Sequence, residues 1–202
     1  VAVCDVNKKR VEGARAKLVA AVPDVEVETY RYYPALLERD EVMQHALAAK
    51  RNGSTRFCMG AAWKGVRGGT EKFEKVLDIV RDVAALNMEV CVTLGELGLE
   101  EAKQLRDAGV TAYNHNLDTS RRHYPNIVST RTYDDRIRTL HAVQKAGVSV
   151  CCGGILGMGE DENDRAKLLL TLANLPQHPE SVPINQLVQV TGTPLKGVAP
   201  LD

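Results

Sequence analysis

The sequence is poor in aromatic residues, carries no net charge and contains no long hydrophobic run. Aromatic residues make up 4% of the 202 positions, and 26 basic residues balance 26 acidic ones. Zero net charge argues against a nucleic acid as the main partner, because phosphate binding usually needs a basic face. No apolar run approaches the ~20 residues that cross a bilayer, so the pattern also argues against a membrane protein.

The cysteines are five in number and widely spaced, at Cys4, Cys58, Cys91, Cys151 and Cys152. An odd count at such spacing is unlike the disulfide framework of a secreted protein. A reducing compartment fits better, and there cysteines are free, metal-bound or catalytic. The first residue is valine and no signal peptide follows it. We therefore expect a cytoplasmic protein that has been cut out of something longer.

Short apolar runs alternate with amphipathic stretches, a pattern that predicts strands followed by helices. The expected strands cover residues 1–6, 25–30, 55–61, 89–95, 112–118, 148–157 and 182–188. The expected helices cover residues 8–21, 40–51, 70–87, 98–108, 131–146 and 161–174. This order predicts a parallel sheet with helices packed outside it. Because a complete eight-unit barrel takes ~250 residues, the chain would hold part of a barrel or an open α/β sheet.

Three of the expected strands each carry a cysteine, namely Cys58, Cys91 and Cys151. If these side chains point to the same side at similar heights, their sulfurs would form a site for a soft metal or an iron–sulfur cluster. Cys152 would face the opposite way, because side chains alternate along a strand. The alternative is that the cysteines only pack as small hydrophobic residues, and spacing alone favours that alternative.

Polar side chains gather at the end of the strand expected over residues 112–118. Asn114, Asn116 and Asp118 would share one face, whereas His115 would point the other way and have a structural role. Polar groups on a buried strand are costly unless something bonds them. A ribose or a ureido ring would satisfy them, and so would a network of hydrogen bonds to neighbouring loops.

Further along the chain, Arg136 could clamp a carboxylate from a helix, although a surface arginine is the simpler interpretation. Asn185 near a strand end offers donors and an acceptor, which alone is weak support for a site. The glycine-rich stretch over residues 153–160 would admit a flat ligand or form a tight turn.

Several blocks of sequence carry a resemblance to a known family. They are Gly53–Trp63, Cys91–Gly95, Tyr113–Ser120, Thr130–Tyr133, Val150–Ile155, Ala173–Pro176 and Glu180–Asn185. Residues 41–202 thereby resemble the middle of a biotin synthase, a radical S-adenosylmethionine enzyme. The length and order of the shared sequence segments make this resemblance specific.

The resemblance implies a partial (βα) TIM-type barrel that inserts sulfur into dethiobiotin during biotin biosynthesis. In that family a 4Fe–4S cluster cleaves S-adenosylmethionine to a deoxyadenosyl radical, and a 2Fe–2S cluster supplies the sulfur. The implied 2Fe–2S ligands are Cys58, Cys91 and Cys151. The implied S-adenosylmethionine contacts are Asn116 and Asp118 to the ribose and Arg136 to the carboxylate. The implied dethiobiotin contacts are Asn114, Asn116 and Asn185.

One departure from the family pattern bears on activity. The C-x-x-x-C-x-x-C motif that binds the 4Fe–4S cluster normally precedes the block at Gly53, but the only cysteine before that block is Cys4. A later strand with an arginine ligand to the 2Fe–2S cluster would lie past Asp202. We therefore expect an inactive fragment that cannot make biotin unaided.

Residues 1–40 resemble a different family, the nicotinamide-dependent oxidoreductases of the glucose–fructose oxidoreductase and inositol dehydrogenase type. The similarity rests on residues 1–7, the helix expected after them and residues 30–40, and it would place Asp5 near a cofactor ribose. The expected domains are thus a Rossmann-like fragment over residues 1–40 and a partial barrel over residues 41–202. A divergent helix-and-strand extension is the alternative for the first segment.

Two rival hypotheses stand beside biotin synthase. The chain could be a non-catalytic α/β fusion or chimera that only keeps these segments. It could also be a nicotinamide-dependent oxidoreductase, although it lacks the phosphate-binding turn and a catalytic base. The expected partner is a small molecule, dethiobiotin, with no nucleic acid and no membrane. Exposed edges of a partial barrel would favour association into a homodimer.

Overall fold

The computed structural model describes residues 2–4, 28–30, 39–189, 194–199 and 201, and it divides the chain into two compact units, Val1–Ser54 and Thr55–Asp202. In the first unit, β1 (Ala2–Cys4) pairs in parallel with β2 (Glu28–Tyr30), and α2 (Arg39–Arg51) follows. Asp5 and the helix expected over residues 8–21 lie outside the described residues. The domain boundary at residue 40 stays a prediction.

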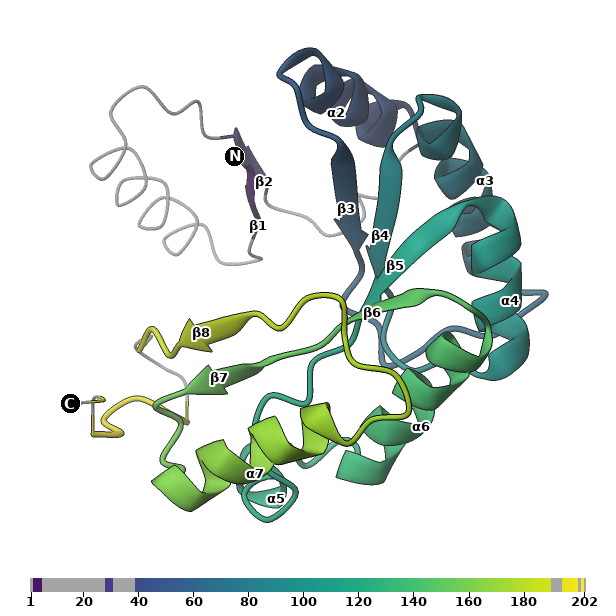
Figure 1. Cartoon of the computed structure of the whole chain (residues 1–202). Helices are drawn as coiled ribbons and strands as arrows, with labels where there is room; N and C mark the ends of the chain where they lie inside the picture. The colour runs from purple at the N-terminus through teal and green to yellow at the C-terminus, as the bar shows by residue number, and fades with distance from the viewer. Residues whose placement is uncertain (1, 5–27, 31–38, 190–193, 200, 202) are drawn as a thin grey trace. The chain divides into compact units, whose positions relative to one another are not determined.

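The second unit is built on a parallel sheet with the order β3-β4-β5-β6. The four strands are β3 (Arg56–Gly60), β4 (Glu89–Thr93), β5 (Val110–Asn114) and β6 (Ser149–Cys151). The helices between them are α3 (Glu71–Ala85), α4 (Leu99–Ala108), a single turn α5 (Tyr124–Ile127) and α6 (Tyr133–Lys145). Figure 1 shows α3, α4 and α6 along one face of the sheet. This arrangement confirms the predicted partial (βα) barrel.

A second pair of parallel strands, β7 (Gly154–Leu156) and β8 (Ile184–Gln186), continues the sheet, with α7 (Glu162–Ala173) between them in sequence. The continuous strand predicted over residues 148–157 is therefore wrong, because β6 ends at Cys151. The interruption at Gly153 lies against Pro183, which has no N–H group for a regular ladder. Isolated bridges from Cys151 to Ser181 and from Asp118 to Gly154 keep the segments aligned.

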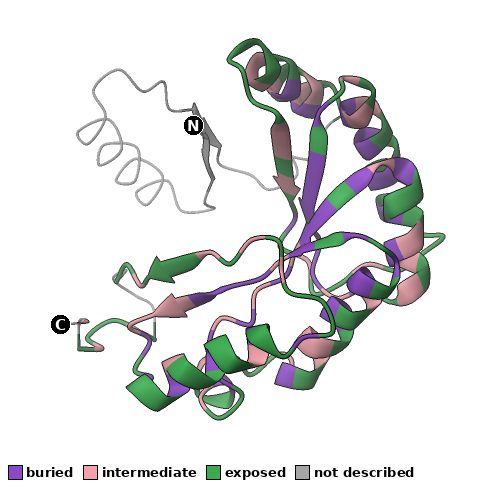
Figure 2. Ribbon diagram, in the orientation of Figure 1, coloured by how far each residue is buried: buried purple, intermediate pink, exposed green. Residues whose placement is uncertain are grey.

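The core lies between the helices and one face of the sheet. Val92, Tyr113 and Val150 are register partners on β4, β5 and β6, and all three are buried. Apolar residues at helical spacing on α3, α4 and α6 are buried as well, as the purple segments of Figure 2 show. At the start of α6, the Thr132 side chain accepts a hydrogen bond from the backbone of Asp135 and caps the helix.

Among the described residues, every helix is too short or too polar to cross a bilayer.

Candidate cluster and ligand site

The strand register places the three candidate cysteines on one side of the sheet. Cys58 on β3 lies opposite Cys91 on β4, and Cys91 lies opposite Ala112 on β5. Cys151 on β6 lies opposite Asn114, which is two residues beyond Ala112 and therefore points to the same side. The cysteines thus face away from the row of Val92, Tyr113 and Val150 that packs on the helices.

Two of the thiols interact directly. The Cys91 thiol is hydrogen-bonded to the sulfur of Cys58, which lowers the pKa of Cys58 to about 6, and the nearby Arg56 lowers it further against the effect of burial. The same hydrogen bond, together with burial, raises the pKa of Cys91. Cys151 is close enough to add to that effect through its charge. The pair is therefore poised to hold a thiolate, the form that binds metals.

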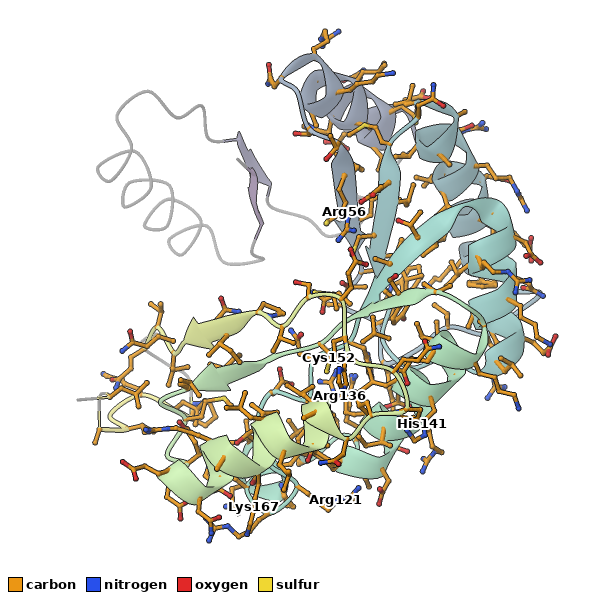
Figure 3. All side chains as sticks on the ribbon, in the orientation of Figure 1. Arg56, Arg121, Arg136, His141, Cys152 and Lys167 are labelled. Carbon is orange, nitrogen blue, oxygen red and sulfur yellow. The ribbon has the colours of Figure 1, made fainter. Side chains whose placement is uncertain are left out.

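Arg56, the first residue of β3, forms two charged hydrogen bonds. It lies two residues before Cys58 on β3, and its guanidinium donates to Glu89 and to Glu180, each at 2.7 Å. These two hydrogen bonds raise the pKa of Arg56, so the charge is permanent at any working pH. Figure 3 labels Arg56 beside β3.

The three cysteines are of the ligand type that iron–sulfur clusters take. Within the described ranges, no group of three or more His, Cys, Asp or Glu side chains could hold one metal ion. A 2Fe–2S cluster is a larger object that takes cysteine thiolates on two separate irons. Three soft ligands in register on adjacent strands fit such a cluster, although the assignment of Cys58, Cys91 and Cys151 as its ligands stays a prediction.

A cavity of about 280 Å³ opens near the carboxyl ends of β3, β4 and β5. Its walls come from the loops that follow these strands and from the start of α6. The lining residues are Ala61, Ala62, Trp63, Thr93, Gly95, Asn114, His115, Asn116, Asp118, Arg131 and Arg136. This is the position where open and closed α/β folds bind their ligands.

Four of the sequence-predicted ligand contacts meet in this cavity. Asn116 accepts a hydrogen bond from the backbone of Gly153 at 3.0 Å, which orients its amide and leaves the NH₂ group for a ligand. Arg136 donates to Asp118 at 3.1 Å and to the hydroxyl of Tyr124 at 3.0 Å. Asn114 completes the set from the end of β5. Their individual roles toward a ligand stay predictions.

Asp118 has an unusual backbone for a non-glycine residue, with φ of 67°. Its backbone accepts from Ile155 and donates to Gly153, so the loop is fixed against the start of β7. Burial raises the pKa of its carboxyl group, and Arg136 and Arg131 oppose that effect. A non-glycine residue held in this region is often part of a binding site, where the surroundings compensate the cost.

His115 differs from the expectation for it. Regular alternation predicted that it would point away from the site, but β5 ends at Asn114, and His115 lines the cavity beside Asn116. Its side chain is buried, and the Nε2 atom has no hydrogen-bond partner among the described residues. Burial lowers the pKa of His115 to about 3, so the ring is neutral at working pH.

Asn185 does not line this cavity. It lies on β8 opposite Ile155 and is exposed. Because Cys151 pairs with Ser181, four residues before Asn185, alternation keeps Asn185 on the cysteine side of the sheet. Its expected contact with a substrate stays a prediction.

The glycine-rich segment forms a tight turn held by one buried carboxylate. Glu160 accepts hydrogen bonds from the backbones of Gly157 and Met158 and from Arg165. Gly157 and Gly159 both have positive φ, which other residues rarely adopt. This is the turn alternative of the two that the sequence left open, and it leads from β7 into α7.

Comparison with known proteins places the chain among related sequences. The sequence model of the Radical SAM superfamily matches residues 4–172. The chain is 58% identical over 167 residues to a biotin synthase of Marinobacter nauticus, covering 83% of this chain and 47% of the relative. It is 55% identical over 160 residues to a biotin synthase of Schizosaccharomyces pombe, covering 79% and 44%. The chain thus spans about half the length of the curated relatives it matches.

Solved structures agree at the level of the fold. Methylornithine synthase superposes with a TM-score of 0.68 and 17% identity, over 78% of this chain and 46% of that protein. The superfamily match begins at residue 4 and runs through the segment that resembles nicotinamide-dependent oxidoreductases. None of the relatives named here is such an oxidoreductase, so the Rossmann-like origin of residues 1–40 is unsupported.

Proposed function

Since the chain belongs to the Radical SAM superfamily, we propose that it is part of a biotin synthase, a cytoplasmic enzyme that inserts sulfur into dethiobiotin. The observation that carries this proposal is the register of the sheet, which aligns Cys58 with Cys91 and sets Cys151 on the same side. The identity of 53–58% to several biotin synthases supports the choice of substrate.

The proposed cofactors are a 2Fe–2S cluster and S-adenosylmethionine. When bound, the cluster would supply the sulfur that is inserted, and S-adenosylmethionine would supply the group that removes hydrogen atoms from dethiobiotin. Cys58, Cys91 and Cys151 would hold the cluster as thiolates. The permanent charge of Arg56 near them would favour that form.

The cavity residues would orient the two small molecules. Asp118 gives one oxygen to Arg136, which leaves the other to accept from a ribose hydroxyl. The free NH₂ of Asn116 would donate to the same ribose or to the ureido carbonyl of dethiobiotin. Arg136 would add a contact to the carboxylate of S-adenosylmethionine, and Asn114 and Asn185 would contact dethiobiotin from β5 and β8.

The superfamily as a whole implies a 4Fe–4S cluster that delivers an electron to S-adenosylmethionine. The 202 residues contain no C-x-x-x-C-x-x-C motif. We therefore infer that these residues alone do not bind that cluster and do not make biotin unaided. What they would retain is the sulfur-donor site and most of the pocket for the small molecules.

The test is anaerobic reconstitution of the purified chain with iron and sulfide, followed by measurement of bound iron, acid-labile sulfide and the visible spectrum. We expect about two irons and two sulfides per chain, the composition of a 2Fe–2S cluster. Ala substitution of Cys58, Cys91 or Cys151 should remove most of the bound iron and the visible absorption.

Cys152→Ala is the matched control. Cys152 is the direct neighbour of Cys151 but is fully buried, and burial raises the pKa of its thiol to about 12, so it is protonated at neutral pH. We expect this variant to bind as much iron as the unaltered chain. A folded chain that takes up no iron, or that loses it equally in Cys152→Ala, would favour the non-catalytic alternative.

A further inference from the structure

Two hydrogen-bond donors in the cavity, His115 and Arg131, have no role in the contacts proposed above. Both line the cavity of about 280 Å³. The Nε2 atom of His115 has no partner among the described residues, although the residue is 1% exposed. A buried polar group without a hydrogen bond is rare in folded proteins, and such a group commonly marks the position of a ligand or a water.

Arg131 is in a similar state. Its side chain is 16% exposed. In the described part of the chain it forms an ion pair with Glu96, whose Oε1 lies 3.7 Å from the Arg131 Nε. That separation is too long for a hydrogen bond, and the same Glu96 oxygen is itself buried without a partner. A guanidinium carries five donors, so this arginine has capacity for another anion.

The second arginine of the cavity, Arg136, already has hydrogen-bond partners within the protein. Arg136 is committed to Asp118 and to Tyr124. The cavity lining contains two arginines and one aspartate, so its net charge is one positive charge. Of these two arginines, Arg131 is the one without a hydrogen bond to the described residues. Burial keeps His115 neutral, and a neutral imidazole can still donate through Nε2 in the corresponding tautomer.

We propose that Arg131 and His115 form a carboxylate-binding subsite in the wall of this cavity, in addition to the contacts assigned above. The guanidinium would supply the charge and two parallel donors, and the imidazole would supply a third donor from the end of β5. The inference rests on the proposed function, under which two carboxylates reach this region, one on S-adenosylmethionine and one on dethiobiotin.

The experiment is equilibrium dialysis of the full chain with four compounds. They are S-adenosylmethionine, its decarboxylated form, dethiobiotin and dethiobiotin methyl ester. Each carboxylic acid forms a pair with its carboxylate-free form. In one of these two pairs, we expect the acid to bind about 10- to 100-fold more tightly than the carboxylate-free form, which is the range for hydrogen bonds to charged groups. The pair that shows the preference identifies the source of the carboxylate.

In Arg131→Gln that preference should fall to within about threefold, while binding of the carboxylate-free form stays unchanged. His115→Leu should reduce the preference, and His115→Gln, which keeps a donor, should restore part of it. Glu96→Gln removes the carboxylate that pairs with Arg131 and should preserve or increase the preference. Arg138→Gln is the matched control, because Arg138 is an exposed arginine of α6 that pairs with Asp135 and does not line the cavity.

Equal affinity for acid and carboxylate-free form in both pairs would overturn the subsite, and so would an unchanged preference in Arg131→Gln. A chain that takes up iron but shows no such preference would refute the subsite and leave the proposed function standing. A chain that neither takes up iron nor binds any of the four compounds would refute both.

Discussion

Removal of one buried oxygen atom, by Tyr113→Phe, is expected to lower the free energy of unfolding by about 2–4 kcal/mol. The Tyr113 hydroxyl accepts from the backbone N–H of Leu94 at 3.2 Å and donates to the carbonyl of Gly95 at 2.8 Å. The residue is 1% exposed, so water cannot easily replace the lost partner. Each of the two buried groups left unpaired here is expected to cost about 1–2 kcal/mol, within the usual range for such groups.

The assay is urea unfolding followed through the single tryptophan, Trp63, which lines the cavity beside Gly95. With a denaturant slope of about 2 kcal/mol per molar urea, the midpoint should fall by about 1–2 M. Burial raises the pKa of the Tyr113 hydroxyl, so the group stays protonated and the effect should not depend on pH near neutrality.

Tyr133→Phe is the control for loss of a tyrosine hydroxyl. The Tyr133 hydroxyl is buried and makes no hydrogen bond with the described residues. Thr171 lies near it, but its own hydroxyl donates to the carbonyl of Lys167. We expect a change within about 0.5 kcal/mol for this variant, because no partner is stranded. If Tyr113→Phe costs no more than Tyr133→Phe, the argument from stranded backbone groups is refuted.

Two further predictions concern stability. Asp164 accepts from Arg122 and from the buried Ser120, and the Arg122 hydrogen bonds lower the pKa of its carboxyl group. A carboxyl group whose pKa is lower in the folded than in the unfolded state stabilises the fold above the unfolded pKa of about 4, and this stabilisation is lost as the pH falls. Asp164→Asn should therefore flatten the acid side of the curve of unfolding free energy against pH. An unchanged slope below about pH 4 would contradict this. Gly153→Ala should lower the free energy of unfolding in urea by about 1–3 kcal/mol, because a Cβ there would lie 1.8 Å from the Pro183 carbonyl oxygen. Gly60→Ala is the control and should be tolerated, because a Cβ there would lie 3.5 Å from its nearest neighbour, the Cβ of Thr93. Equal costs for the two variants would refute the steric argument.

The elements that the sequence predicted best are those with long periodic patterns. The helix expected over residues 70–87 is observed as α3, and the one expected over residues 131–146 is observed as α6. Their buried positions recur at spacings of three and four. The four-residue α5 was missed, because one turn that begins with Tyr124 and Pro125 has no periodicity to detect.

Site residues were predicted where a residue type was unusual on an apolar strand, as for Asn114 and the three cysteines. Their alignment was not predictable, because it depends on the register between strands far apart in sequence, such as β5 and β6, whose partners Asn114 and Cys151 are 37 residues apart. A shift of one residue would turn each cysteine to the helix side. His115 and Arg131 were not recognised as ligand-facing for a different reason. Alternation fails once β5 ends at Asn114, and Arg131 lies in a loop where no period applies.

Gly153 links the interrupted strand to the ligand site. Pro183 has no N–H for the ladder beside Gly153, and the backbone N–H of Gly153 donates to the side-chain oxygen of Asn116. That hydrogen bond occupies the Asn116 oxygen and leaves its NH₂ group available to a ligand. The carbonyl of Gly153 in turn accepts from the backbones of Leu117 and Asp118, which holds Asp118 in its positive-φ conformation. A regular strand over residues 148–157 would satisfy the Gly153 backbone within the sheet, and Asn116 and Asp118 would then lose the contacts that orient them.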